Sequence, residues 1–176
     1  NCLVFDTEIE CAYLVGDFAI ETDADFTPDA RHSECYSGSF TLTAQKPTVC
    51  VRDVVQDGYP FFGGHLHVSF PYTYRAGDPT VLKLGGRFAT CDVAVNGTPA
   101  GEMLFHREME LAPYLREGEN TITLDVANAM RNLMGPHHNP QGEPYGIGPG
   151  SFSPHGNYSP SSWRERYCFV KAGLGE

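Results

Sequence analysis

The chain has 176 residues, with 12 lysines and arginines against 22 aspartates and glutamates, and its formal net charge is −10. This length suits one domain with a core of its own, spanning residues 1–176, and it is too short for a (β/α)8 barrel of about 250 residues. The acidic balance, without a basic cluster, argues against nucleic acid and an anionic membrane as partners. No apolar run approaches the roughly 20 residues of a membrane-spanning helix.

The composition favours an all-β protein with many turns. The chain holds 19 glycines and 13 prolines, its aromatic content is 12%, and its charged content is only 19%. The six cysteines form no CxxC pair, and several stand among apolar neighbours. They are interpreted as reduced thiols that serve as small hydrophobic residues, which favours a cytoplasmic over a secreted protein. An even number of cysteines leaves disulfides open, and the sequence assigns no pairing.

Alternation of apolar and polar residues predicts strands along most of the chain. The clearest alternation runs over 65–75, and the dipeptide Asn96-Gly97 predicts a type I′ hairpin. The best helix candidate is about one turn within 110–116, and Pro113 limits it. The expected strands are 11–21, 40–43, 65–75, 89–96, 121–126 and 166–174. This pattern predicts an antiparallel β-sandwich, with a jelly roll as the expected architecture.

Residues 135–162 form a long segment rich in glycine, proline and histidine, with little periodicity. At nearly thirty residues it exceeds an ordinary connection between strands. It is therefore predicted to be a functional loop or a loop fixed against neighbouring structure.

Three consecutive blocks carry a family resemblance. Phe88–Gly101 contains the stretch Val-Ala-Val-Asn-Gly, and it is followed by Glu110–Asn120 and Thr121–Asn128. Together they resemble the sugar-binding jelly-roll domain of glycoside hydrolase family 2. Asn120 can bond its own backbone where the last of these strands begins.

Further blocks resemble a carboxy-terminal domain of large bacterial glycoside hydrolases of the β-galactosidase and α-rhamnosidase kind. They are Glu10–Phe18, Gly58–Gly64, Arg131–His138 and Trp163–Leu174. The resemblance implies a galactose-binding-like jelly roll, excised from a larger enzyme whose catalytic barrel lies elsewhere. The catalytic carboxylates of the family belong to that barrel, so no catalytic residue is assigned here and the chain alone is expected not to be an enzyme.

Polar and aromatic residues of the long loop and its flanks are the candidate carbohydrate ligands. Arginine, asparagine, histidine and glutamate bond sugar hydroxyls, and an aromatic ring stacks on a pyranose face. The candidates are Arg131, Asn132, His137, His138, Glu143, Tyr145 and Trp163. The alternative for the loop is docking on the core or on a catalytic domain, and for Trp163 a core or interface anchor.

A metal site has two weak candidates, His65 and His67, because residues i and i+2 of a strand share a face. With Gly63-Gly64 ahead, they are similar to the opening of the cupin motif, but the carboxylate expected next is missing. The resemblance also makes a structural Ca²⁺ possible, with no other cofactor expected. Its candidates by residue type are Asp17, Asp23, Asp25 and Asp29.

Three functions follow from these patterns. The first is a non-catalytic carbohydrate-binding accessory domain of a bacterial glycoside hydrolase, with a glycan and the catalytic domain of the same polypeptide as partners. The second is a structural domain that braces the catalytic barrel or a dimer, which predicts an exposed apolar patch. The third is a cupin-like metal protein that uses His65 and His67.

Overall fold

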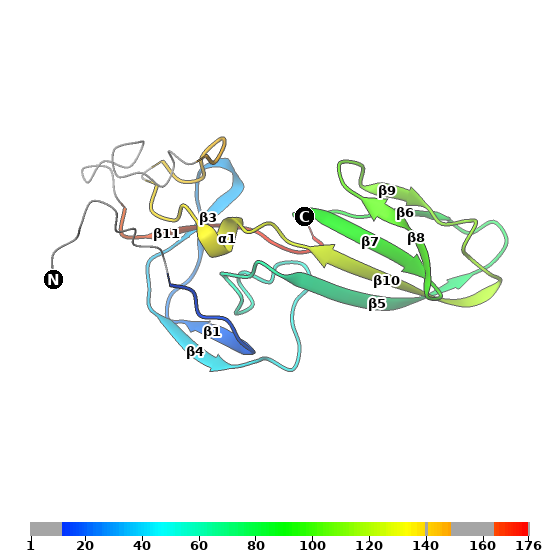
Figure 1. Ribbon diagram of the computed structural model, residues 1–176, viewed down its shortest axis with the longest axis horizontal. Helices are drawn as coiled ribbons and strands as arrows, with labels where there is room; N and C mark the ends of the chain where they lie inside the picture. Colours follow the sequence, from blue (N-terminus) through cyan, green and yellow to red (C-terminus); the bar gives the residue numbers. More distant parts are fainter. Residues whose placement is uncertain (1–11, 140, 149–163, 176) are drawn as a thin grey trace, which may run out of the picture.

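The computed structural model describes residues 12–139, 141–148 and 164–175, and antiparallel strands dominate them. The prediction of an all-β chain is confirmed. The described strands form one four-stranded sheet, one three-stranded sheet and two strand pairs. They are arranged as two lobes along the long axis of the molecule (Figure 1). The jelly-roll arrangement remains a prediction.

The first lobe is built on a sheet in the order β5-β10-β7-β8. A short pair, β6 with β9, belongs to the same lobe (Figure 1). The strands are β5 (His65–Tyr74), β6 (Val81–Lys83), β7 (Thr90–Val95), β8 (Thr98–Met103), β9 (Glu108–Glu110) and β10 (Gly118–Ala127). The strands predicted at 65–75, 89–96 and 121–126 are confirmed as β5, β7 and β10.

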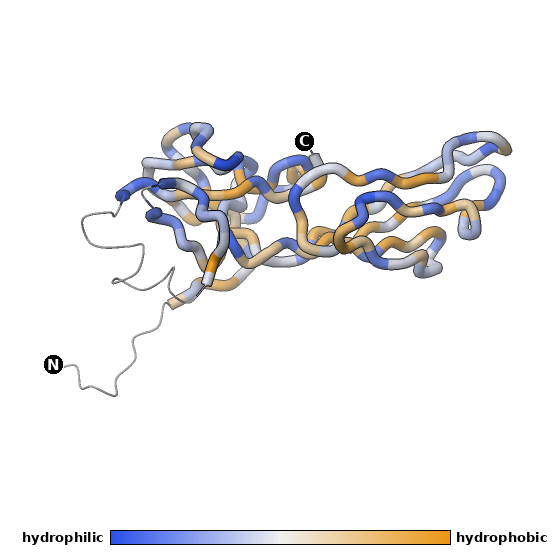
Figure 2. The backbone as a smooth tube through the Cα atoms, turned by 90° about the horizontal axis from the view of Figure 1, so that it is seen from above, coloured by the Kyte–Doolittle hydropathy of each residue, from blue (hydrophilic) through white to orange (hydrophobic). Residues whose placement is uncertain are grey.

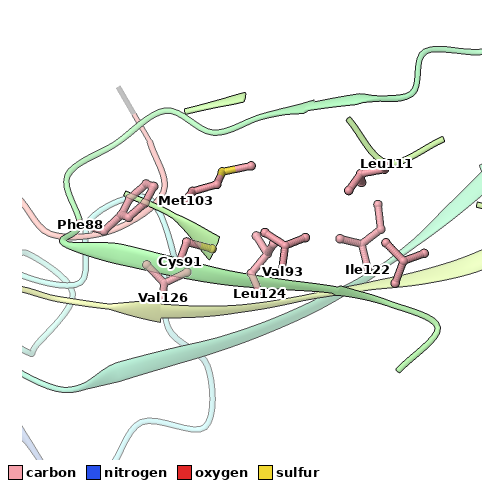
Figure 3. Close-up of a cluster of buried hydrophobic side chains, with 9 residues drawn as sticks. Phe88, Cys91, Val93, Met103, Leu111, Ile122, Leu124 and Val126 are labelled. Carbon is pink, nitrogen blue, oxygen red and sulfur yellow. The ribbon is translucent and has the colours of Figure 1, made fainter. Parts of the chain in front are cut away.

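Alternation explains the core of this lobe. Every second residue of β7 and β10 is buried, and their side chains gather on one side of the sheet (Figure 3). The buried cluster comprises Phe88, Cys91, Val93, Val95, Met103, Leu111, Ile122, Leu124 and Val126. The alternate residues of β5 pack against this cluster only partly buried, so β5 forms the edge of the core.

The second lobe joins segments that are far apart in the sequence. A three-stranded sheet has the order β11-β3-β2, and β1 pairs with β4 beside it (Figure 1). The elements are β1 (Phe18–Thr22), β2 (Thr27–Pro28), η1 (Ala30–His32), β3 (Ser33–Tyr36), β4 (Phe40–Ala44), α1 (Arg131–Met134) and β11 (Tyr167–Val170).

Aromatic rings form most of the core of the second lobe. Tyr36 and Phe169 are fully buried, and Phe40 packs edge-on against Phe169 with ring centroids 6.2 Å apart. Leu66 of β5 packs against this cluster and against the cluster of the first lobe. The apolar residues therefore run on from one lobe into the other, as the orange segments of Figure 2 also show.

Two predicted strands are shorter in the structure. Of the strand expected at 11–21, the structure shows only β1. Phe18 pairs with Ala44, the last residue of β4, so the described residues before Phe18 have no β4 residue opposite them. The strand expected at 166–174 ends at Val170, because the chain no longer runs beside β3 after this residue. Ala172 instead accepts a backbone hydrogen bond from the amide of Val54. The short turn expected within 110–116 agrees with the structure, where the amide of Leu115 donates to the carbonyl of Leu111.

The hairpin and its anchoring asparagine agree with the sequence. Asn96 and Gly97 both have positive φ, 52° and 79°, as a type I′ turn requires. The Asn120 side chain is buried, and its amide donates to the carbonyls of Arg116 and Gly118 at 2.8 and 2.9 Å. Its Oδ1 accepts from Asn96 Nδ2 at 2.8 Å. One side chain thus holds the start of β10 to the hairpin.

Replacing Asn120 with alanine should lower the free energy of unfolding by about 2–3 kcal/mol, because several buried polar groups lose their partner at once. Urea unfolding followed by circular dichroism measures this loss. Thr123→Ala, on the exposed face of the same strand, is the control and should shift stability by no more than about 0.5 kcal/mol. Equal effects of the two substitutions would contradict the anchoring role of Asn120.

Candidate functional site

Arg131 and Glu143, two of the candidate sugar ligands, form a buried ion pair. The Arg131 guanidinium donates through Nη2 and Nε to Glu143 Oε2 at 2.7 and 3.0 Å. The two side chains are only 7% and 10% exposed. Arg31 donates to the backbone carbonyl of Glu143, and Arg87 lies 3.8 Å from its other carboxylate oxygen. These contacts compensate buried charge and fix the segment 141–143 against α1.

The side-chain amide of Asn132 bonds to the backbone of β11 as the peptide group of a neighbouring strand would. Its Nδ2 donates to the carbonyl of Val170 at 2.7 Å, and its Oδ1 accepts from the amide of Val170 at 2.9 Å. Asn132 is 1% exposed, so these bonds have no competition from water. In its sheet β11 lies at the edge, and α1 thereby fixes that edge.

His137 lies inside the aromatic core of the second lobe. Its ring packs against Phe61 and Phe169 with centroids 5.6 and 5.0 Å apart, and Nδ1 lies 3.0 Å from the carbonyl of Cys168. That contact makes Nδ1 the donor, and no described residue partners the buried Nε2. Burial lowers the pKa of His137 to about 4. The imidazole is therefore neutral at neutral pH.

His138 is less deeply placed than its neighbour. Its Nδ1 lies 2.9 Å from the carbonyl of Arg164, and its ring packs on Tyr167 with centroids 4.6 Å apart. Burial also lowers the pKa of His138. Both histidines thus hold the segment after α1 against β11.

Tyr145 differs from the other candidate ligands, because its side chain is 94% exposed. The Arg31 guanidinium lies over its ring, 4.5 Å from the centroid, and also donates to the carbonyl of Gln141. A ring so exposed can stack on a sugar. Trp163 and residues 149–162 of the long loop lie outside the described residues.

His65 and His67 share one carboxylate of the neighbouring strand. Their Nδ1 atoms lie 2.8 and 3.4 Å from Asp125 Oδ1, on the exposed face of the sheet. The sequence could not place Asp125 there, because the register of β5 and β10 joins positions 60 residues apart. Across the described ranges, no group of three or more histidine, cysteine, aspartate or glutamate side chains is placed to hold a metal ion.

Two of the calcium candidates make internal contacts. Asp23 accepts from the Ser39 amide at 2.7 Å and from the Tyr36 hydroxyl at 2.9 Å, and these hydrogen bonds, chiefly that from Ser39, lower the pKa of Asp23. Asp29 pairs with Arg164 at 3.1 Å. In the described part of the chain, the four aspartates are not gathered into a group that could hold a metal ion.

An apolar cavity of about 310 Å³ was not located by sequence reasoning, although an exposed apolar patch was predicted for a structural domain. It is open to solvent and lies between β1, the segment before β5, and α1. Its lining residues are Leu14, Val15, Gly16, Phe18, Ile20, Gly58, Tyr59, Phe61, Phe62, Gly63, Gly64 and Leu133. The run Tyr59-Pro-Phe-Phe was the available signal, but its aromatics are equally typical of an ordinary core.

Exposed apolar side chains continue the cavity onto the surface. Leu14 and Val15 of its wall are 65% and 88% exposed, and Met130 and Met134, which flank Leu133, are about half exposed. Single exposed apolar residues are normal on protein surfaces, whereas a group of them beside an apolar cavity is typical of an interaction site. This group, with the cavity, is called the apolar face below.

Two solved structures show a distant likeness to the chain. A β-D-glucuronidase from Dictyoglomus thermophilum is 16% identical over 65% of this chain and 19% of its own, with a TM-score of 0.33. A rhamnosidase from Novosphingobium sp. PP1Y is 16% identical over 97% of this chain and 16% of its own, with a TM-score of 0.45. Both are glycoside hydrolases, and the chain spans less than a fifth of either. These values are too low to support a statement on function.

No protein-family model matches the chain, and no curated protein matches it in sequence. The described part of the chain contains no helix long and apolar enough to cross a membrane.

The largely enclosed imidazole of His137 predicts an acid-dependent loss of stability. Its pKa is about 4 in the folded state and about 6.5 in the unfolded state, so below pH 6.5 protons bind preferentially to the unfolded chain. The stabilisation is complete above pH 6.5 and falls as the pH approaches 4, by about 3 kcal/mol in all. Urea unfolding at successive pH values between 7 and 4 measures the loss.

His137→Phe removes the titrating group but keeps an aromatic ring, and its stability should depend less steeply on pH over this range. The matched control is His67→Ala, since His67 is exposed on the sheet, and it should retain the dependence of the wild type. A His137→Phe profile parallel to that of the wild type would refute the assignment.

Proposed function

We propose that this chain is a non-catalytic accessory domain of a bacterial glycoside hydrolase, and that its apolar face packs against the catalytic part of the same polypeptide. One observation carries the proposal. Three separate segments that resemble the carboxy-terminal domain of such enzymes, 10–18, 58–64 and 131–138, supply every lining residue of the cavity except Ile20. The galactose-binding-like jelly roll implied by the resemblance is part of the proposal.

The chemistry of the cavity favours apolar side chains as its occupant. Its walls are leucine, valine, isoleucine, phenylalanine and glycine, and the one side-chain hydroxyl, that of Tyr59, already accepts a hydrogen bond from the Lys46 amide at 3.2 Å. A sugar needs several convergent polar groups to replace its water. Apolar side chains of another domain need none, and their burial is favourable.

The contacts of the candidate sugar ligands point in the same direction. Arg131, Asn132 and His137 bond to Glu143, Val170 and Cys168, so their polar atoms hold the domain together. These bonds position α1, which places Leu133 in the cavity wall. The polar residues thereby shape the apolar face.

Carbohydrate binding is the second candidate function, and Tyr145 is the observation that favours it. Arg31 and the segment 141–143 lie close to the exposed ring. Polar groups that could bond sugar hydroxyls are therefore next to a ring on which a sugar could stack. Glu143 and Arg131 would act here by positioning this segment. A structural Ca²⁺ remains an expectation of the resemblance.

Substitution of Val15 tests the packing proposal. Val15→Asp should leave the melting temperature of the 176-residue chain unchanged, because the side chain is 88% exposed. In the longer polypeptide, hydrogen exchange should show 58–64 and 130–134 protected relative to the isolated chain. Val15→Asp should reduce that protection, because it places a charge in an apolar interface.

Phe105→Asp is the matched control. Phe105 is 95% exposed and lies in the β8–β9 connection, outside the cavity lining, so its replacement should leave the protection intact. Equal exchange of both segments in the isolated chain and in the longer polypeptide would overturn the proposal. A glycan-array signal that is lost in Tyr145→Ala and kept in Val15→Asp would instead establish the second function.

A further inference from the structure

Two buried cysteines face each other across the sheet of the second lobe. Cys35 lies on β3 and Cys168 on β11, and the antiparallel register places them directly opposite one another. They are 4% and 2% exposed. They come from opposite ends of the described chain, so only the folded register brings them together.

This register provides the backbone spacing of a disulfide. Directly opposite residues of antiparallel strands have Cα atoms about 4.5 or about 5.5 Å apart, depending on the hydrogen-bonding position. Disulfides span Cα separations of about 4.4 to 6.8 Å. Opposite residues also point to the same face of the sheet. Both thiols therefore start on one face, at a spacing that a disulfide accepts.

Each of the two sulfur atoms also contacts polar side chains of neighbouring elements. Cys35 Sγ lies 3.2 Å from Thr27 Oγ1, the residue opposite it on β2, and accepts from Arg166 Nη1 at 3.2 Å. Cys168 Sγ lies 3.9 Å from Arg131 Nη2. Each sulfur thus has a guanidinium beside it.

The other described cysteines lack such a counterpart. Cys91 is buried in the first lobe, where Met103 and Val126 lie opposite it. Cys50 is exposed and lies outside the strands. Cys2 and Cys11 lie outside the described residues.

We propose that Cys35 and Cys168 are a redox pair that forms a cross-strand disulfide, with a small-molecule disulfide such as oxidised glutathione as the oxidant. One thiolate attacks the glutathione disulfide, giving a mixed disulfide and one glutathione thiolate. The second cysteine thiolate attacks the protein sulfur of the mixed disulfide, which forms the Cys35–Cys168 bond and releases the second glutathione as a thiolate. Two protein thiols lose two electrons and two protons, and one oxidised glutathione becomes two reduced molecules.

Burial decides when the pair reacts. Neither thiol is open to a glutathione molecule in the closed structure, and burial raises the pKa of Cys168. The strand β11 has only four residues and lies at the sheet edge, so it can open locally. The disulfide therefore forms during folding or during such opening, and it then fixes β11 to β3.

Refolding in a glutathione redox buffer tests the proposal. The reduced 176-residue chain is refolded with excess oxidised glutathione, its free thiols are blocked with N-ethylmaleimide, and unreduced peptides are identified by mass spectrometry. The peptides containing Cys35 and Cys168 should be recovered linked, and dithiothreitol should separate them. The oxidised protein should melt several degrees higher than the reduced protein, because the cross-link restricts the unfolded chain.

Cys35→Ala and Cys168→Ala should each abolish this linked peptide, and the remaining cysteine should be recovered as a blocked thiol or as its mixed disulfide with glutathione. Cys91→Ala is the control, a buried cysteine without a cysteine opposite, and it should keep the linkage. Recovery of Cys35 and Cys168 as blocked thiols in the refolded wild type, or linked to other cysteines, would overturn the proposal whether or not the variants fold.

Discussion

The two hydrogen bonds between the Asn132 amide and Val170 are the constraint on which the second lobe depends. The last strand has four residues, lies at a sheet edge, and carries the fully buried Phe169 at the centre of the aromatic cluster. A short edge strand gains little from pairing on one side alone. Asn132 bonds both backbone groups of the residue after Phe169, and thereby keeps that ring in the core.

The same constraint explains how a polar loop gives rise to an apolar face. Asn132, the Arg131–Glu143 ion pair and His137 all direct polar atoms toward β11 or the segment 141–143. The opposite side of α1 then presents Leu133 to the cavity, between the exposed Met130 and Met134. Binding by this face and stability of the last strand are thus coupled, because both depend on where α1 lies.

Much of the first lobe could be predicted from the sequence, because its signals are local. Alternation identified β5, β7 and β10, and Asn96-Gly97 has the positive φ angles of the predicted turn. The candidate site required non-local information. Arg131 and Glu143 are residue types that are common in sugar-binding loops. Their burial as an ion pair depends on tertiary packing, which cannot be read from residue type. The apolar cavity and the Cys35–Cys168 register likewise need segments that meet only in the folded chain.

Amide hydrogen exchange at Val170, followed by nuclear magnetic resonance, tests the central role of Asn132 most directly. The account predicts that this edge-strand amide is protected in the wild type, and that Asn132→Ala lowers its protection by at least about tenfold, equivalent to about 1.4 kcal/mol, while the protection of Leu124 in the centre of β10 is unaffected. Rapid exchange of Val170 in the wild type, or unchanged protection in Asn132→Ala, would contradict it.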